Sequence, residues 1–304
     1  MRRTGRHISI AALVFSFASL SPIAFTQAAA KATPPPAIAV APQYDTTHVY
    51  VAPADVDAFV ASFLGTFGGT STKQVVVTVT PTPSLTSSQL LQTPVGTVSL
   101  FGFKTPIPAP FGTERTGYLV TDMDAAINRA KTTGADVIVT PFPDPIGLDA
   151  VIEWPGGVRT QIYWHTTPPS YAPFVMVPEN RVYLSPEGVG RFLNSFLAFS
   201  GGRVVSDEGS APGVEIGLPQ SSFRRLRVES AFGKLTVFVT DHFLSFPHGR
   251  ETTGYEVADF NSTVAKAQSL GVKLLVPPIT IQNRTSAIVE FPGGYIAEIH
   301  SVAP

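Results

Sequence analysis

The chain repeats HVYVAP, residues 48–53, as RVYLSP, residues 181–186, an offset of 181 − 48 = 133 residues. Further on, TGY at residues 116–118 returns at residues 253–255, an offset of 253 − 116 = 137. EWPGG at residues 153–157 then returns as EFPGG at residues 290–294. Self-similarity at a nearly fixed spacing indicates a duplicated structural unit. We therefore expect two domains of one fold, residues 46–165 and residues 180–304.

The first thirty residues differ from both copies. Three arginines at positions 2, 3 and 6 precede an apolar run over residues 8–25, and small residues follow up to Ala30. This order is typical of a secretory signal peptide, so we expect residues 1–30 to be removed and the protein to be periplasmic or secreted. A membrane anchor is the alternative, but the run is short and is interrupted by serines and Pro22. We expect no stable membrane insertion after cleavage.

Two proline-rich stretches flank the first copy. Residues 31–45 predict a stiff, exposed tether, and residues 166–179 predict a linker between the domains. Without residues 1–30 the chain carries 21 − 3 = 18 basic and 22 acidic residues, with no basic stripe, so we expect no nucleic-acid partner. The absence of cysteine excludes disulfides and thiolate chemistry. Each domain, at about 120 residues, is long enough to bury a core of its own.

Each copy divides again into two modules. In the first module, apolar residues at 56, 59, 60, 63 and 64 have the spacing of one helix face, and residues 189, 192, 193, 196 and 197 repeat it. In the second module, Asp122 and Gly134 are typical of a helix start and end, and Asp259 and Gly271 repeat them. Runs rich in β-forming residues follow the first-module helices. They cover residues 75–79 and 95–103 in the first copy and 204–205, 214–217, 223–229 and 235–240 in the second.

The order of one strand, one helix and three strands, read four times, resembles the vicinal oxygen chelate superfamily, which includes glyoxalase I, extradiol dioxygenases and the fosfomycin- and bleomycin-resistance proteins. TGYLVTDMD at residues 116–124 with Gly134, and EWPGG at residues 153–157, are the passages most similar to it. The resemblance implies an α+β fold of two tandem glyoxalase-like domains, each made of paired βαβββ modules. It is specific for the fold and not for a reaction, because one fold hosts many chemistries.

The resemblance also implies a divalent metal ion in the hollow of each paired sheet, held by side chains of the first and last strands. The matching positions are His48, Arg115 and Gln161 in the first copy and Arg181, Thr252 and Glu298 in the second. An arginine does not ligate a metal, so neither copy keeps a full set and we expect the conventional site to be degenerate. The cofactor is therefore not determined by the sequence, and a divalent metal ion is the candidate that the resemblance implies.

The pairing of modules decides which of these residues meet. If modules pair within copies, which we expect, Glu298 faces Arg181 and the two form a salt bridge in a cavity, or Arg181 anchors a substrate carboxylate. If modules pair across copies, His48 and Glu298 converge as metal ligands. The other histidines are weaker candidates: His165 and His300 are expected to be exposed, and His242 and His248 lie in a loop that is either plain surface or a cover over the cavity. Glu153 and Glu290 recur in both copies, which favours a structural role.

The sequence therefore predicts an exported glyoxalase-like protein that binds a small organic molecule in a concave sheet cavity. Its ligand contacts would come from Arg115, Gln161, Arg181 and Thr252. The alternative is a metal-dependent lyase or dioxygenase, with His48 and Glu298 as metal ligands and Glu298 also as the catalytic base. A third interpretation is a structural pair of domains without catalysis.

Overall fold

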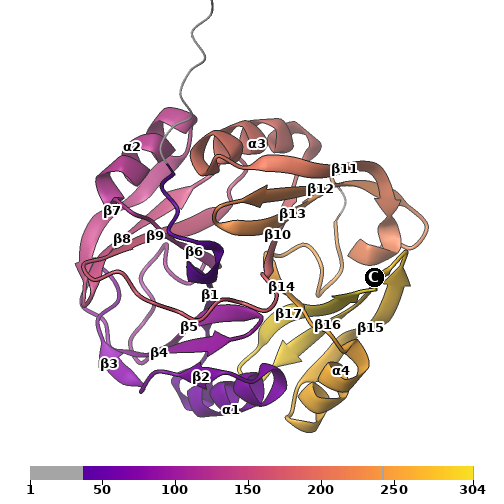
Figure 1. Cartoon of the computed structure of the whole chain (residues 1–304), viewed down its shortest axis with the longest axis horizontal. Coiled ribbons are helices and arrows are strands. Elements are labelled where there is room, and N and C mark those ends of the chain that lie inside the picture. Colours follow the sequence, from indigo (N-terminus) through magenta and orange to yellow (C-terminus); the bar gives the residue numbers. More distant parts are fainter. Residues whose placement is uncertain (1–36, 242, 304) are drawn as a thin grey trace, which may run out of the picture. The chain divides into compact units, whose positions relative to one another are not determined.

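The computed structural model describes residues 37–241 and 243–303, and its strands form two sheets (Figure 1). The predicted signal peptide and residues 31–36 of the predicted tether lie outside the described residues. The first sheet has the order β2-β4-β5-β1-β6-β9-β8-β7, with β3 beside β4, and the second has the order β11-β12-β13-β10-β14-β17-β16-β15. Apart from β3, the two sheets have the same strand order, as the sequence repeat predicts.

The four modules have these bounds. The first copy contains β1 (Asp45–Tyr50), α1 (Val56–Phe67), β2 (Thr70–Ser71), β3 (Val75–Val77), β4 (Thr86–Thr93) and β5 (Gly96–Phe103), then β6 (Thr116–Leu119), α2 (Met123–Thr133), β7 (Asp136–Asp144), β8 (Gly147–Glu153) and β9 (Arg159–His165). The second copy contains β10 (Glu179–Leu184), α3 (Pro186–Ser200), β11 (Arg203–Pro212), β12 (Ser222–Ser230) and β13 (Gly233–Val239), then β14 (Thr252–Glu256), α4 (Phe260–Ser269), β15 (Lys273–Ile281), β16 (Arg284–Phe291) and β17 (Tyr295–Val302).

Modules pair within copies. The antiparallel pair β1–β6 joins the modules of the first sheet, and the antiparallel pair β10–β14 joins those of the second. On either side of each joint the strands are parallel, β1 with β5 and β6 with β9 in the first sheet. His48 on β1 and Glu298 on β17 therefore belong to different sheets, and the pairing across copies is not formed.

The helix starts and ends predicted from capping residues agree with the structure. The Asp122 carboxylate accepts a hydrogen bond of 2.8 Å from the amide of Ala125 at the start of α2, and Gly134 ends that helix at φ 97°, a left-handed conformation that favours glycine. The strand predictions agree with the structure less closely. The β4 strand was not predicted, because its polar residues hide the β pattern. Residues 214–217, predicted as a strand, begin inside a short 3₁₀ helix, Gly213–Ile216.

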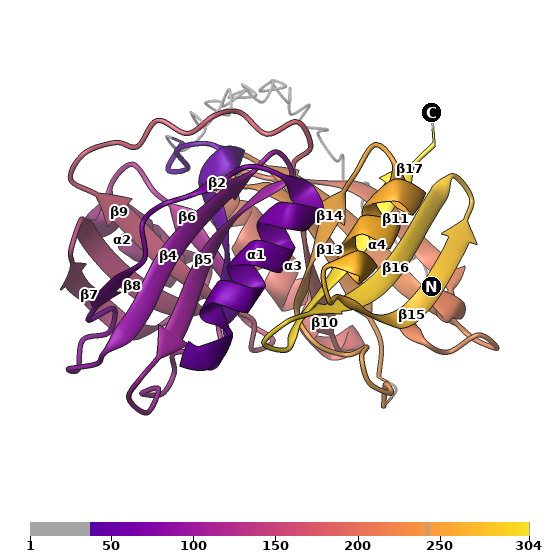
Figure 2. The ribbon, with the colours of Figure 1, turned by 90° about the horizontal axis from the view of Figure 1, so that it is seen from below.

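The large hydrophobic cores are shared between the copies, which corrects the expectation that each domain buries its own. Trp154 of the first copy packs edge-on against Phe196 of the second, with ring centroids 5.5 Å apart, and Tyr118 stacks on Phe232 at 4.4 Å. A second core unites Phe63 with Phe291 at 5.3 Å. Figures 1 and 2 show the reason: α2 lies beside α3, and α1 lies beside α4. Aromatic burial across this joint holds the two sheets together.

The segment before β1 is also part of this unit. Ile38 is buried, Ala39 forms a β-bridge to Val120, and the Tyr44 hydroxyl donates to the carbonyl of Pro169 at 2.8 Å. The exposed tether predicted for residues 31–45 is therefore wrong over residues 38–45, because apolar side chains among the prolines anchor the chain. Within the described ranges, no helix has the length and apolar character needed to cross a bilayer.

Candidate functional site

The first sheet encloses an open hollow of about 170 Å³, here called the first hollow. His48 of β1 and Gln161 of β9, two of the predicted site residues, both line it. Six of its lining residues are aromatic: Tyr50, Phe101, Phe103, Phe111, Tyr163 and Tyr171. An apolar cavity with a few polar groups at defined places is the usual form of a small-molecule site.

The polar groups of the first hollow carry no fixed positive charge. Among its lining residues there is no lysine or arginine, whereas Asp144 and Asp149 are both present. Burial raises the pKa of Asp149 well above its ordinary value, the nearby Asp144 raises it further, and a hydrogen bond with Gln161 opposes the shift. The Asp149 carboxyl therefore favours its neutral form, which both donates and accepts hydrogen bonds.

His48 is backed by a buried carboxylate that sequence reasoning did not find. Its Nδ1 lies 3.6 Å from Oε1 of Glu114, which is fully buried, and the Tyr50 hydroxyl donates to the same oxygen. The repeated TGY motif explains how His48 fits against β6: a Cβ on Gly117 would lie 2.6 Å from Nε2 of His48. Glycine is needed there so that the imidazole can lie against the strand.

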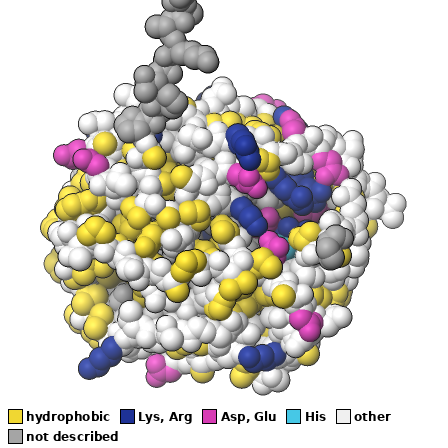
Figure 3. All heavy atoms as spheres, in the orientation of Figure 1, with side chains coloured by type: hydrophobic (Ala, Val, Ile, Leu, Met, Phe, Trp, Pro, Cys, Tyr) yellow, Lys and Arg dark blue, Asp and Glu magenta, His cyan; other side chains and the backbone are white. Residues whose placement is uncertain are grey.

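The second sheet holds charged groups in the corresponding place, here called the second hollow. The predicted Arg181–Glu298 ion pair is present, and both side chains are almost fully buried. Arg284 of β16 donates to Glu179 at 2.5 Å and to Glu298 at 2.9 Å. Arg181 also donates to Glu179 at 3.1 Å, so each carboxylate contacts both guanidinium groups. Figure 3 shows basic and acidic side chains gathered in a hollow over this sheet.

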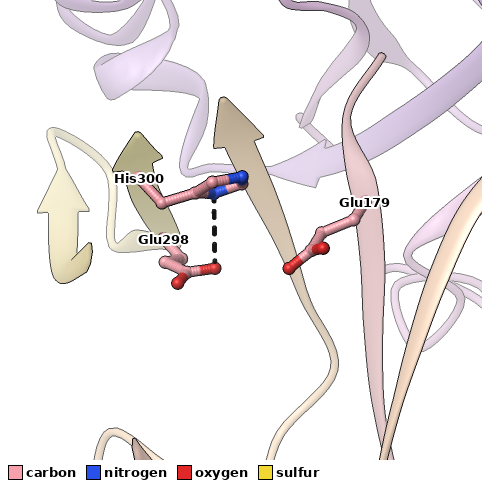
Figure 4. Close-up of side chains that lie close together, drawn as sticks. All are labelled: Glu179, Glu298 and His300. Carbon is pink, nitrogen blue, oxygen red and sulfur yellow. Dashed lines mark ion pairs between the residues drawn. The ribbon is translucent and has the colours of Figure 1, made fainter. Parts of the chain in front are cut away.

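The ion pairs and burial determine in which direction the pKa of each of these groups is shifted. Burial opposes the charged form of Glu179 and Glu298, but the neighbouring guanidinium groups outweigh it and hold the pKa of each carboxyl below its ordinary value. Burial lowers the pKa of His300, so this side chain is neutral at pH 7. Figure 4 shows His300 and Glu298 projecting from β17 toward Glu179 of β10, with Nδ1 of His300 3.6 Å from Glu298.

Two sequence expectations fail here. His300 is 2% exposed and not a surface residue, because it lies on the inward face of β17, two positions after Glu298. Glu179, placed in the linker over residues 166–179, is the first residue of β10 and is buried. The proline-rich composition before it concealed that the strand had already begun.

A comparison of the copies shows that the two hollows differ at equivalent positions. Strand registers pair Ser88 with Phe101 and Arg225 with Phe238, which gives the offset 225 − 88 = 238 − 101 = 137. Six lining residues of the first hollow thus have charged or titratable counterparts in the second copy, whereas Asp144 and Asp149 align with the uncharged Ile281 and Ser286. The pairs are Thr46 with Glu179, His48 with Arg181, Ser88 with Arg225, Leu90 with Arg227, Gln161 with Glu298 and Tyr163 with His300. The second hollow retains cavities of about 50 and 10 Å³.

Neither hollow fits a divalent metal ion in its present form. Among the described residues, the one group of three or more His, Asp and Glu ligand atoms within 4.8 Å of one another is Glu179, Glu298 and His300. Both of its carboxylates already bind Arg181 and Arg284, whose positive charges oppose a cation. In the first hollow, His48 and Gln161 lie with Asp149, but no third His, Asp or Glu atom completes such a group.

The remaining predicted residues lie apart from the two hollows. Arg115 precedes β6, and its guanidinium lies over the Tyr50 ring at 5.8 Å, in a separate cavity of about 90 Å³ shared with Glu251. Thr252 pairs with Arg181 in the strand register but lines no cavity described for the structure.

The secondary candidates separate into site and structural residues. His165 is partly buried and lines the first hollow, which corrects the expectation that it is exposed. His248 lies over the second hollow beside Arg181, so its loop covers the cavity, whereas His242 is outside the described residues. Glu153 pairs with Arg159 at 2.6 Å and Glu290 with Lys273 at 2.7 Å, which are structural contacts across neighbouring strands.

Glu251 makes a pH-dependent contribution to stability at the joint between the copies. It accepts a hydrogen bond of 3.3 Å from Thr116, and burial raises its pKa to about 8, against the opposing effect of Arg115. The folded state thus keeps a proton that the unfolded chain releases above its ordinary pKa, so the free energy of unfolding falls as pH rises from about 4.5 to 8.

We expect Glu251→Gln to remove this fall in the free energy of unfolding with rising pH. Relative to the parent protein, the variant should gain about 1–3 kcal/mol between pH 5 and pH 9 in urea unfolding. Glu229→Gln, at an exposed carboxylate of β12, is the matched control and should follow the parent. A Glu251→Gln curve parallel to the parent across this range would contradict the assignment.

Comparison with known proteins places this geometry in a structural class. No family model and no curated protein sequence matches the chain. Among solved structures, it is similar to a mutant of 4-hydroxymandelate synthase from Streptomyces coelicolor, with 15% identity, a TM-score of 0.61, and coverage of 89% of this chain and 93% of the other.

Two further structures share the architecture. A Mn(II)-bound glyoxalase from Novosphingobium aromaticivorans has 15% identity and a TM-score of 0.53, with 87% of this chain and 82% of the other covered. The 2,3-dioxygenase LapB from Pseudomonas sp. KL28 has 11% identity and a TM-score of 0.51, with 88% and 94% covered. The chain has the vicinal oxygen chelate fold in tandem, which confirms the α+β fold and the resemblance seen in its sequence. At these identities the likeness shows the fold alone.

Proposed function

We propose that this protein binds a small aromatic molecule without an anionic group in the first hollow, and that the second copy serves as its structural partner. The observation that carries the proposal is the contrast at equivalent positions. Six lining positions are uncharged or histidine in the first copy, where a hollow of about 170 Å³ is open, and form a charged, largely filled cluster in the second.

The chemistry of the lining defines the ligand class. Aromatic walls favour a flat apolar body, and His48, Gln161 and Asp149 offer hydrogen bonds at defined points. An organic anion would be buried beside Asp144 and Asp149 with no lysine or arginine to pair with it, and an unpaired buried charge is costly. A neutral hydroxyl or an amine meets no such cost, and an amine would favour the ionised form of Asp149. The metal-dependent lyase or dioxygenase has less support, because no such group of donor atoms forms among the described residues of the first hollow and arginines already bind the carboxylates of the second.

Three probes with one ring and different termini test this proposal: 2-phenylethylamine, 2-phenylethanol and phenylacetate. We expect calorimetric titration of the purified protein to show binding of the first two at least about tenfold tighter than that of phenylacetate, a difference of about 1.4 kcal/mol. Ser99→Phe should fill the hollow and abolish binding, because Ser99 lines it. Ser269→Phe, on the exposed side of α4, is the matched control. Tighter binding of phenylacetate, or binding unaffected by Ser99→Phe, would refute the proposal.

We also propose that the protein acts outside the cytoplasm, on the basis of the charged start, apolar run and small residues of residues 1–30. N-terminal sequencing of protein from its native host should then begin near Lys31. Soluble protein that retains Met1 would contradict export.

A further inference from the structure

Arg227 of β12, at the edge of the second hollow, forms no ion pair with any residue that the structure describes. Its side chain is partly buried, and its Nε is buried without a hydrogen-bond partner. Neighbouring guanidinium groups are engaged: Arg225 binds Glu208 and Glu215, and Arg284 binds Glu179 and Glu298. A buried polar group without a partner costs free energy, more so when it is charged. The Nε of Arg284 also lacks a partner, but a terminal nitrogen of Arg284 binds two carboxylates, whereas Arg227 forms no ion pair within the described residues.

The surroundings of Arg227 favour a negative charge. It lines a cavity of about 50 Å³ together with Arg225 and Arg284, and with the uncharged side chains of Gln282 and Ser286. Burial lowers the pKa of Arg227, and Arg225 and Arg284 lower it further, against the opposing effect of the carboxylates of Glu179 and Glu215. The carboxylate of Glu215 also lines this cavity, but Arg225 already binds it.

We propose that this cavity binds a small oxyanion group, phosphate or carboxylate, with Arg227 as its principal partner. A guanidinium group presents a planar fork of N–H donors that matches the oxygens of such groups. The resulting ion pair is stronger where water is excluded. The equivalent residue of the first copy is Leu90, so the site exists in the second copy alone and is independent of the ligand proposed for the first hollow.

The experiment titrates the purified protein with inorganic phosphate and, separately, with acetate at constant ionic strength, followed by calorimetry. We expect saturable binding of one anion per chain, at least about tenfold weaker in Arg227→Gln. Arg224→Gln, at an exposed arginine of the same strand that pairs with Asp207, should bind within about twofold of the parent. The comparison of phosphate with acetate shows which oxyanion the cavity prefers.

A second measurement does not depend on the choice of probe. In a buffer free of oxyanions, Arg227→Met should unfold at the same or a higher temperature than the parent, because it removes a buried cation without a partner. Added phosphate or acetate should then raise the melting temperature of the parent and leave that of Arg227→Met unchanged. The proposal is overturned if neither anion binds the parent saturably, if Arg227→Gln binds equally well, or if Arg227→Met is strongly destabilised in anion-free buffer.

Discussion

Arg181→Ala is expected to lower the free energy of unfolding by about 3–5 kcal/mol at pH 7, measured by urea unfolding. Arg181 donates to both Glu179 and Glu298, and its guanidinium also lies over the Phe238 ring at 4.7 Å. Its removal leaves two buried carboxylates with Arg284 as the remaining strong partner. The loss of a partner from a buried ion pair costs much more than the pair itself contributes, because the desolvated charge remains.

Two controls separate this effect from the loss of any arginine. Arg224→Ala removes an exposed guanidinium paired with Asp207 and should cost no more than about 1 kcal/mol. Arg181→Ala combined with Glu298→Gln should recover part of the lost stability, because it also removes the unpaired charge. If Arg181→Ala costs no more than Arg224→Ala, the second hollow is not held together by its ion pairs.

The repeat made the fold predictable from sequence. Helix faces, caps and terminating glycines are local signals, and each was present twice, so Asp122 and Asp259 support one another. The pairing of modules within copies was also expected, because the arginines at ligand positions suggested lost metal sites. The shared cores were not expected. Trp154 and Phe196 have the pattern of residues that face some core, but periodicity does not say which copy supplies the opposite face.

The candidate site was predictable only in part. His48, Gln161, Arg181 and Glu298 line the hollows because they occupy positions fixed by the fold. Glu114, Glu179, Arg284 and His300 belong to no motif, and their contacts depend on which strand face turns inward. The residue differences between the two copies did indicate that the two hollows differ in charge. Gly147 aligns with Arg284 and Leu90 with Arg227 at the offset of 137, so a position-by-position comparison would have indicated a change from an open to a charged hollow.

A change of two residues is expected to convert the second hollow into a metal site. Glu179, Glu298 and His300 already place one ligand atom each within 4.8 Å of the others, and two guanidinium groups now neutralise the carboxylates. Arg181→His combined with Arg284→Gln removes both cations and adds a fourth donor on β10, where His48 stands in the first copy. Carboxylate and imidazole ligands together suit first-row divalent metals.

We therefore expect the double variant to bind one Co²⁺ per chain, seen as visible d–d absorption, while the parent binds none tightly. Binding at a hundred times the dissociation constant should stabilise the variant by about 2.7 kcal/mol, which replaces part of what the arginines contributed. The same variant with Glu298→Gln is the matched control and should lose the absorption, because Glu298 is one of the three ligands already present. A folded double variant without bound Co²⁺ would show that the carboxylates are arranged for guanidinium partners alone. Metal binding would instead show that the guanidinium groups of Arg181 and Arg284 occupy, in the second copy, a position where a metal ion can bind.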